Sequence, residues 1–268
     1  MTTTSPVTIS TPVDLVAAVP AILGFAPERS LVVLGFTGTR LQMGARVDLP
    51  TTDTETAQAV TALAKGIGAA TPVAVVLVGA VEHRSITTAL RETFAQVRSV
   101  HTVADYRIGR TVRDETGTPV GCLPDHRGTN VGLAHAVAGR TTAPSRNTLV
   151  TEIAEGETTP EAQAAADTLT DADTRDQALI TAVADEAARA RWTQVATQSR
   201  GQGRARVAAL LAAAWYASGD GPRARVCADA AHHIEPANTL AGLVGASLDS
   251  GMPPHVFREA VTAAARRQ

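Results

Sequence analysis

Hydrophobic and polar positions in the first fifty residues follow the patterns of a helix and two strands. Ser10-Thr11-Pro12 is a typical helix start, and the apolar stretch after it predicts a helix that ends near Gly24. Leu31–Leu34 is continuously apolar, which indicates a strand covered on both faces. From Leu41 to Pro50 apolar and polar residues alternate, as they do in a half-exposed strand. A short polar turn joins the two strands.

Strands and helices continue to alternate over the next sixty residues. The pattern predicts a helix over Asp53–Ala69, a buried strand over Val73–Val78, a helix from about His83 to Val97 and a strand from about Val100 to Ile108. Strands separated by helices favour a sheet that is at least partly parallel, with helices packed on its faces. Because the first two strands form a hairpin, we predict a mixed sheet, and an α/β domain over residues 11–140.

The second half of the chain has a helical pattern almost throughout. From Thr159 onward the apolar positions recur with helical spacing, interrupted at Gly201–Gly203. We therefore predict an all-helical C-terminal domain of helical hairpins over residues 158–268. A polar, Thr-rich connector over residues 141–157 precedes it, and residues 1–10 are interpreted as a mobile lead-in.

The last four predicted helices contain a weak internal repeat. Ser218-Gly219-x-x-Pro222 recurs 32 positions later as Ser250-Gly251-x-x-Pro254, with a predicted helix on each side. A helix–turn–helix unit of this length is similar to tetratricopeptide architecture. Two units are few for a solenoid, and the other matches are mostly alanines, so accidental packing periodicity is the alternative interpretation.

Composition limits the functional classes. Of 268 residues, 44% are hydrophobic and 19% charged, and the net charge of −2 gives no reason to expect nucleic-acid binding. The two cysteines, Cys122 and Cys227, lie in different predicted domains, which is typical of free thiols in a reducing compartment. The first ten residues lack the features of a signal peptide, and the longest apolar stretch, Val13–Phe25, is too short to span a bilayer. We expect a cytoplasmic protein that does not contact membranes.

Patterns typical of catalysis or cofactor binding were not found. Cys227 precedes His232 and His233 by five and six residues, so neither histidine has the i, i+4 spacing of a helical metal site. The segment Gly128–Gly132 lacks the lysine and the glycine spacing of a phosphate loop. No serine lies in a G-x-S-x-G context. We therefore predict no catalytic residue, no metal and no cofactor.

One group of polar residues has a suggestive placement. Glu28, Arg29 and Ser30 lie in the turn that leads into the first buried strand, while Arg46 and Asp48 lie two residues apart on one face of the next strand. A carboxylate and a guanidinium held together could bind an anionic ligand, or the carboxylate could act as a base. The simpler alternative is that a carboxylate pairs with an arginine and ties the turn to the sheet.

Several blocks in the chain resemble an actinobacterial family, DUF4192, a domain of unknown function. The blocks are Gly24–Val33 (GFAPERSLVV), Ala45–Pro50 (ARVDLP), Ser145–Leu149, Arg175-Asp176, and Ala214-Trp215 followed by Gly219-Asp220-Gly221. Many members of that family have a cysteine-rich hairpin near the middle, of which only Cys122-Leu123-Pro124 remains here. The resemblance therefore implies no metal or redox role for this chain, and it implies no reaction or substrate.

These observations give two functional hypotheses. The first is a non-catalytic binding or regulatory module whose helical domain presents a surface to a protein partner, based on the helical hairpins and the absence of a catalytic pattern. The alternative is an enzyme or small-ligand sensor with an anionic-ligand site near Glu28, Arg46 and Asp48.

Overall fold

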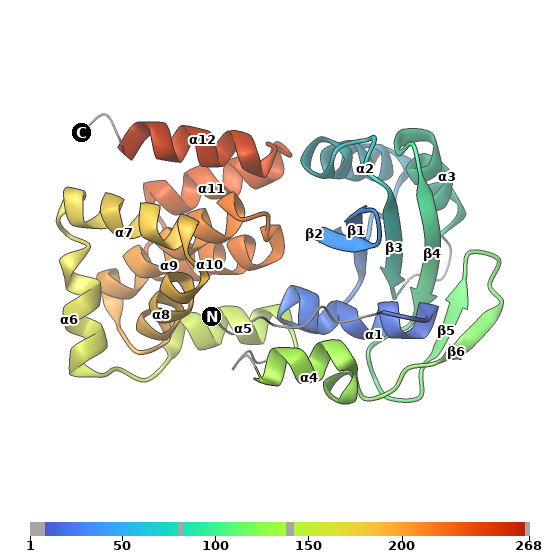
Figure 1. Cartoon of the computed structure of the whole chain (residues 1–268), viewed down its shortest axis with the longest axis horizontal. Coiled ribbons are helices and arrows are strands. Elements are labelled where there is room, and N and C mark those ends of the chain that lie inside the picture. The colour runs from blue at the N-terminus through green and yellow to red at the C-terminus, as the bar shows by residue number, and fades with distance from the viewer. Residues whose placement is uncertain (1–8, 80–82, 138–141, 266–268) are drawn as a thin grey trace. The chain divides into compact units, whose positions relative to one another are not determined.

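The computed structural model describes residues 9–79, 83–137 and 142–265 (Figure 1). Most of the predicted lead-in, residues 1–8, lies outside the described residues. The chain forms two compact units, which are described separately. The α/β unit comprises residues 1–61 and 69–146, and the helical unit comprises residues 62–68 and 147–268.

A six-stranded mixed sheet forms the centre of the α/β unit. The strands are β1 (Ser30–Thr37), β2 (Arg40–Asp48), β3 (Val73–Val78), β4 (Val97–Val103), β5 (Thr111–Asp114) and β6 (Pro119–Cys122). Their order is β2-β1-β3-β4-β5-β6; β3 and β4 are parallel, and every other neighbouring pair is antiparallel. Every residue of β3 is buried, as its continuous apolar sequence predicts. The predicted mixed sheet is thus confirmed.

Helices cover both faces of this sheet (Figure 1). They are α1 (Pro12–Leu23), α2 (Asp53–Ile67) and α3 (Arg84–Thr93); the short 3₁₀ helix η1 (His126–Gly128) and α4 (Asn130–Val137) pack against α1. Two glycines allow α1 to lie close to one face. A Cβ at Gly44 in β2 would lie 3.3 Å from Ile22, and a Cβ at Gly121 in β6 would lie 2.7 Å from Val13. Helix α1 therefore crosses the face from one edge strand to the other, while α3 and the start of α2 lie on the opposite face (Figure 1).

Strand β4 is shorter than predicted. It runs from Val97 to Val103, whereas the sequence pattern predicts a strand from about Val100 to Ile108; the helix predicted as far as about Val97 ends at Thr93. The reason is local: the Asp105 carboxylate accepts a hydrogen bond from the main-chain N–H of Arg107 (3.0 Å), which closes a tight turn. The predicted turn at Asp114–Gly117 does join two strands, β5 and β6.

The helical unit is built around one central helix. Its helices are α5 (Arg146–Glu155), α6 (Pro160–Thr168), α7 (Ala172–Ala184), α8 (Glu186–Thr197), α9 (Gly201–Ala217), α10 (Gly221–Ile234), α11 (Thr239–Asp249) and α12 (Pro254–Ala265). Every residue from Val207 to Ala214 in α9 is buried. Helices α6, α7, α8, α10, α11 and α12 all pack against α9, which explains why the middle of this helix has no solvent face. Much of the segment predicted as a connector, residues 141–157, is helical in α5. None of the helices in the described residues is long and apolar enough to cross a membrane.

A buried arginine fixes the start of α9. Arg204 is 2% exposed and donates hydrogen bonds to the main-chain oxygens of Ala154 (2.6 Å), Gly156 (2.5 Å) and Thr197 (3.4 Å). These oxygens lie at the carboxyl ends of α5 and α8, where helix carbonyls lack helical partners and carry partial negative charge. Carbonyl oxygens thus take the place of a carboxylate in stabilising this guanidinium.

The sequence repeat corresponds to a structural repeat at two helix ends. After α9, the N–H groups of Ser218, Gly219 and Asp220 bond to main-chain oxygens of the last turn, and Gly219 has a φ of 90°. After α11, Ser250, Gly251 and Met252 make the same three bonds 32 positions later, and Gly251 has a φ of 64°. In both turns the serine hydroxyl also bonds to the oxygen three residues earlier. The two hairpins share one helix-ending motif. Their packing around α9 differs from a solenoid, in which each unit contacts only its neighbours.

Candidate functional site

The predicted ligand residues lie at one edge of the sheet, at the carboxyl ends of the parallel strands β3 and β4. Ser30 opens β1 and is paired in register with Val78 at the end of β3 on one side and with Asp48 at the end of β2 on the other. Glu28 and Arg29 form the turn just before Ser30. We call this edge the strand-end rim. In open α/β sheets, ligands bind preferentially at the carboxyl ends of parallel strands.

Arg46 is the centre of the contacts on the strand-end rim. Its Nε donates to the Ser30 hydroxyl (2.8 Å), and one terminal nitrogen donates to the main-chain oxygen of Glu28 (3.3 Å) and pairs with Asp48 (2.7 Å). The Ser30 hydroxyl in turn donates to the same Glu28 oxygen (2.6 Å). Ser30 is fully buried, and the Arg46 side chain is 16% exposed. Arg46 therefore ties the turn before β1 to strand β2.

This geometry brings together only part of the predicted group. Arg46, Ser30 and Asp48 are joined, and Glu28 contributes its main-chain oxygen. The Asp48 side chain is 88% exposed, so water screens its ion pair strongly. Within the described residues, neither the Glu28 carboxylate nor the Arg29 guanidinium makes a hydrogen bond or ion pair. The contacts of Arg46 are those of a structural tie, while Arg29 keeps its charge exposed at the rim.

The backbone of Arg29 is in an unusual conformation. Among the non-glycine residues that the structure describes, Arg29 has a positive φ, 40°. It lies against Gly79, the residue that follows β3: a Cβ on Gly79 would lie 3.5 Å from the Arg29 Cα. The main-chain oxygen of Arg29 accepts a hydrogen bond from Leu49 (2.7 Å). Strained residues of this kind occur preferentially at binding and catalytic sites, so the chemistry that this rim could support is the binding of an anion by Arg29.

Two titratable residues near the rim were missed by the sequence analysis. His101 in β4 is 5% exposed and lies opposite Asp114 of β5; burial lowers the pKa of His101, and the charge of Asp114 acts against that shift. Asp105 follows β4, and hydrogen bonds from Arg110 and Arg107 hold the pKa of its carboxyl well below its usual range. The pairing of His101 with Asp114 depends on strand register, which local sequence does not reveal. Asp105 pairs with arginines only two and five residues away, and this cluster in the loop after β4 is the signal that could have found it.

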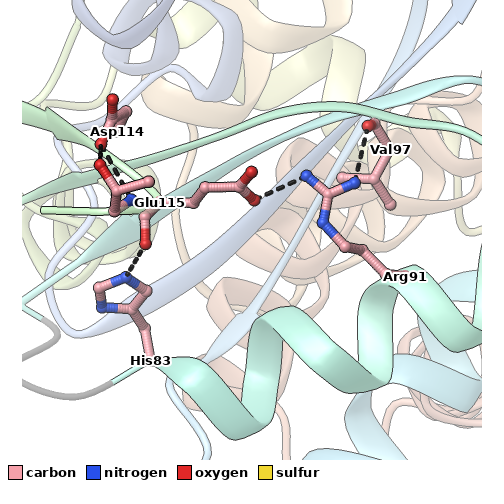
Figure 2. Close-up of polar contacts among 6 residues, drawn as sticks. His83, Arg91, Val97, Asp114 and Glu115 are labelled. Atoms are coloured by element: carbon pink, nitrogen blue, oxygen red, sulfur yellow. Dashed lines mark hydrogen bonds and ion pairs between the residues drawn. The ribbon is translucent and has the colours of Figure 1, made fainter. Parts of the chain in front are cut away.

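A further polar cluster links α3 to the turn between β5 and β6 (Figure 2). Arg91 donates to the Glu115 carboxylate (2.6 Å) and to the main-chain oxygen of Val97 (3.4 Å). The His83 ring nitrogen Nε2 lies 3.3 Å from the main-chain oxygen of Glu115, so Nε2 must carry the proton in this contact. Arg91 and Glu115 are both well exposed. The cluster ties a helix to a hairpin and does not form an enclosed site.

The cysteines and the histidine pair do not form a metal centre. Cys227 is buried in α10, and burial raises the pKa of its thiol to about 12. In the part of the chain that the structure describes, no three His, Cys, Asp or Glu side chains are placed to hold a metal ion.

Comparison with known families adds one finding to this geometry. A family model for a domain of unknown function, DUF4192, matches residues 12–170 and 155–255. The chain belongs to the DUF4192 family. Comparison of this DUF4192 chain with curated proteins and with solved structures gives no match.

One of the DUF4192 sequence blocks maps to a stacked cluster in the helical unit. The guanidinium groups of Arg189 and Arg223 each lie 5.2 Å from the centre of the Trp215 ring. Asp220 accepts a hydrogen bond from the main-chain N–H of Arg223 at the start of α10 (3.1 Å) and also pairs with the Arg223 side chain. Arg189 donates to the main-chain oxygens of Ala182 (2.7 Å) and of the next residue at the end of α7. This block of the DUF4192 chain therefore joins α7, α8, α9 and α10.

The helical unit of this DUF4192 chain also exposes large apolar side chains. Leu243 in α11 is 56% exposed and Val256 in α12 is 42% exposed. Ala246, one helical turn after Leu243, and Ala260, one helical turn after Val256, are exposed as well. We call these four exposed residues, two on α11 and two on α12, the α11–α12 stripe and take them as the second candidate site.

Proposed function

We propose that this protein is a non-catalytic binding module that contacts a protein partner through the α11–α12 stripe of its helical unit. The observation that carries the proposal is the exposure of Leu243 and Val256 in a unit whose central helix is continuously buried from Val207 to Ala214. Each exposed large aliphatic side chain leaves apolar area in water, and burial of that area against a partner is favourable by about 25 cal/mol per Å². Apolar side chains grouped on a surface are typical of interaction sites.

The test uses the full chain and a double variant in which two exposed apolar side chains of the stripe are replaced by aspartate. Proteins captured by the wild-type chain are identified by mass spectrometry, and direct binding is then measured with the purified partner. Leu243→Asp with Val256→Asp should abolish this binding without lowering the melting temperature, since both side chains are exposed. The matched control is Ile108→Asp, which changes an apolar side chain 69% exposed on the α/β unit. Loss of binding in the Ile108→Asp control would contradict the proposal. Unchanged binding in the double variant Leu243→Asp with Val256→Asp would contradict it as well.

The strand-end rim supports a second candidate function, a sensor or enzyme for a small anionic ligand. The specific observation is the strained, exposed Arg29 at the carboxyl ends of the parallel strands. A thermal-shift screen against nucleotides and anionic metabolites tests it, because a ligand that binds only the folded state raises the melting temperature. Arg29→Gln should remove any such stabilisation, whereas Arg40→Gln, on an exposed arginine at the other end of β2, should not.

A further inference from the structure

The sheet of the α/β unit has two edge strands of different kinds. Strand β6, at one edge, has four residues, of which Pro119 lacks a main-chain N–H, as is typical of a protected edge. Strand β2, at the other edge, has nine residues, and none of them is buried. An extra residue, Gln42, interrupts the pairing of β2 with β1, but the segment from Met43 to Asp48 pairs without a break. This regular segment is the longer and more accessible of the two edges.

Three residues of this segment direct their main-chain groups away from the sheet. In an antiparallel pair, residues alternate between those that bond to the partner strand and those that face the opposite side. The N–H of Leu49 donates to the main-chain oxygen of Arg29 (2.7 Å), in register with the pairing of β1 and β2. The odd-numbered residues of this segment therefore bond to β1, and Gly44, Arg46 and Asp48 face outward.

A second hydrogen bond gives the same assignment. The N–H of Phe36 donates to the main-chain oxygen of Pro72 (2.9 Å), in register with the pairing of β1 and β3. The even-numbered residues of β1 thus bond to β3, and the residues opposite them in β2 are Gly44, Arg46 and Asp48. Within the described residues, the main-chain groups of these three make no hydrogen bond. Strand β2 therefore presents a row of free donors and acceptors.

Charged side chains make this row complementary to a second copy of itself. Arg46 and Asp48 lie on one face of β2; the Nη1 of Arg46 makes no contact with the rest of the described chain, and the Asp48 side chain is 88% exposed. Suppose that an identical strand lies antiparallel, with Val47 opposite Val47 of the second copy. Arg46 then lies opposite Asp48 of the second copy, and Asp48 lies opposite its Arg46. In this register the outward-facing residues of the two strands also meet, so their main-chain groups can bond.

Other arrangements of two copies fit less well. A twofold axis at Arg46 places two arginines opposite each other, and so does parallel pairing in register; like charges directly opposite are unfavourable. An axis at Ala45 places Asp48 opposite Gln42, where the extra residue breaks the regular pairing. The axis at Val47 satisfies the charges and the main-chain groups together, and it brings two β-branched side chains into contact.

We infer that two copies of this chain associate through their β2 strands, antiparallel and with a twofold axis at Val47. The two sheets join into one, and because the contact is made by the same surface on both copies, the assembly closes as a dimer. Main-chain hydrogen bonds supply the affinity in strand addition, while the two Arg46–Asp48 pairs select the register. One added strand pairing is a small interface, so the dimer is reversible and depends on protein concentration.

Cysteine cross-linking of the full chain tests the register. The background carries Cys122→Ser, which removes the exposed thiol. At the axis the Cβ atoms of the two side chains at position 47 lie roughly 5 Å apart, so Val47→Cys should form a covalent dimer rapidly under mild oxidation. Ala45→Cys is the matched control. It lies on the same face two residues away, opposite Leu49 of the second copy, and should cross-link much more slowly.

Sedimentation velocity of the full chain tests the charge pairing. The wild-type chain should change from monomer to dimer as the protein concentration rises. In Asp48→Arg the new arginine faces Arg46 of the second copy, so dimerisation should weaken by more than about tenfold. Glu92→Arg makes the same change of charge on an exposed residue of α3 and should dimerise like the wild type.

Four outcomes would overturn the inference. A monomer at every concentration would leave the β2 edge to a strand of another protein. A dimer without rapid cross-linking of Val47→Cys would use another surface. Faster cross-linking of Ala45→Cys than of Val47→Cys would place the axis elsewhere on β2. Equal dimerisation of Asp48→Arg and Glu92→Arg would show that the Arg46–Asp48 pairs do not select the partner strand.

Discussion

The Nε of Arg46 donates a hydrogen bond to the buried hydroxyl of Ser30, 2.8 Å away and sixteen residues earlier in the sequence. Removal of the hydroxyl in Ser30→Ala leaves a partly buried charged donor without its acceptor. We expect a loss of about 1–2 kcal/mol in the free energy of unfolding. Asp48→Asn should cost under about 1 kcal/mol, because the Asp48 carboxylate is mostly exposed.

These two changes are best measured by hydrogen exchange of β1 and β2. Both tryptophans, Trp192 and Trp215, lie in the helical unit, so their fluorescence does not report on this sheet. A double-mutant cycle of Arg46→Gln with Ser30→Ala should show clear non-additivity, as expected of residues in contact. Additive effects would mean that the two side chains are uncoupled in solution.

Arg204→Met should destabilise the helical unit by about 3 kcal/mol. The change keeps most of the apolar stem but leaves the oxygens of Ala154 and Gly156 buried without donors. Urea unfolding followed by tryptophan fluorescence measures the effect. Arg206→Met, on a more exposed arginine of the same helix, is the control and should cost under about 1 kcal/mol. Equal losses in the two variants would refute the role assigned to Arg204.

Tyr216→Phe should cost about 1–2 kcal/mol, because the Tyr216 hydroxyl is hydrogen-bonded to the main-chain oxygen of Ser247 (3.0 Å) and contacts that of Met252. The ring contact with Phe257 is kept in this variant. The matched control is Tyr106→Phe, since the Tyr106 hydroxyl is buried without a hydrogen-bond partner among the residues that the structure describes. Its removal should be neutral or stabilising. A larger loss for Tyr106→Phe than for Tyr216→Phe would contradict both assignments.

Stability of the α/β unit should fall on mild acidification because of His101. Burial lowers the folded-state pKa of His101 below its unfolded value of about 6.5. Around and below that pH the unfolded chain therefore binds more protons than the folded one. The contribution of His101 is fully present above the unfolded pKa and is lost as the pH falls through it toward the folded pKa.

Hydrogen exchange of β4 between pH 8 and pH 5, corrected for intrinsic exchange rates, measures this dependence. His101→Gln should make the stability of β4, measured in this way, less dependent on pH. His255→Gln, which replaces an exposed histidine of α12, should leave it as in the wild type. An unchanged slope in His101→Gln would show that another group is responsible.

The elements of the fold that sequence predicts best are those with strong local patterns. Continuous apolar sequence located β3, alternation located β2, and Ser-Gly followed by proline located both hairpin turns of the helical unit. The end of β4 was misplaced because it depends on the side chain of Asp105, which closes a turn that periodicity cannot detect.

The candidate sites were predicted less completely, for physical reasons. Arg46 and Asp48 were correctly placed as neighbours, because residues two apart on a strand share a face. The hydrogen bond from Arg46 to Ser30 depends on strand register. The hydrogen bonds from Arg204 to the main-chain oxygens of Ala154 and Gly156 join residues about fifty positions apart. The exposure of Leu243 and Val256 could not be predicted, because it depends on which helices pack around each hairpin, and the repeat-equivalent residues Leu211 and Ala224 are buried.

The position of α9 in the chain affects how the protein is made. Helices α6, α7 and α8 leave the ribosome before α9, against which they pack, so the sides that face α9 have no partner until Ala217 has been synthesised. At about 5–20 residues per second, the interval from Pro160 to Ala217 lasts roughly 3–11 s. During that interval the nascent chain presents helices that can pack only against one another, through the contacts of α6 and α7 with α8, and their sides that face α9 stay open to chaperones and proteases.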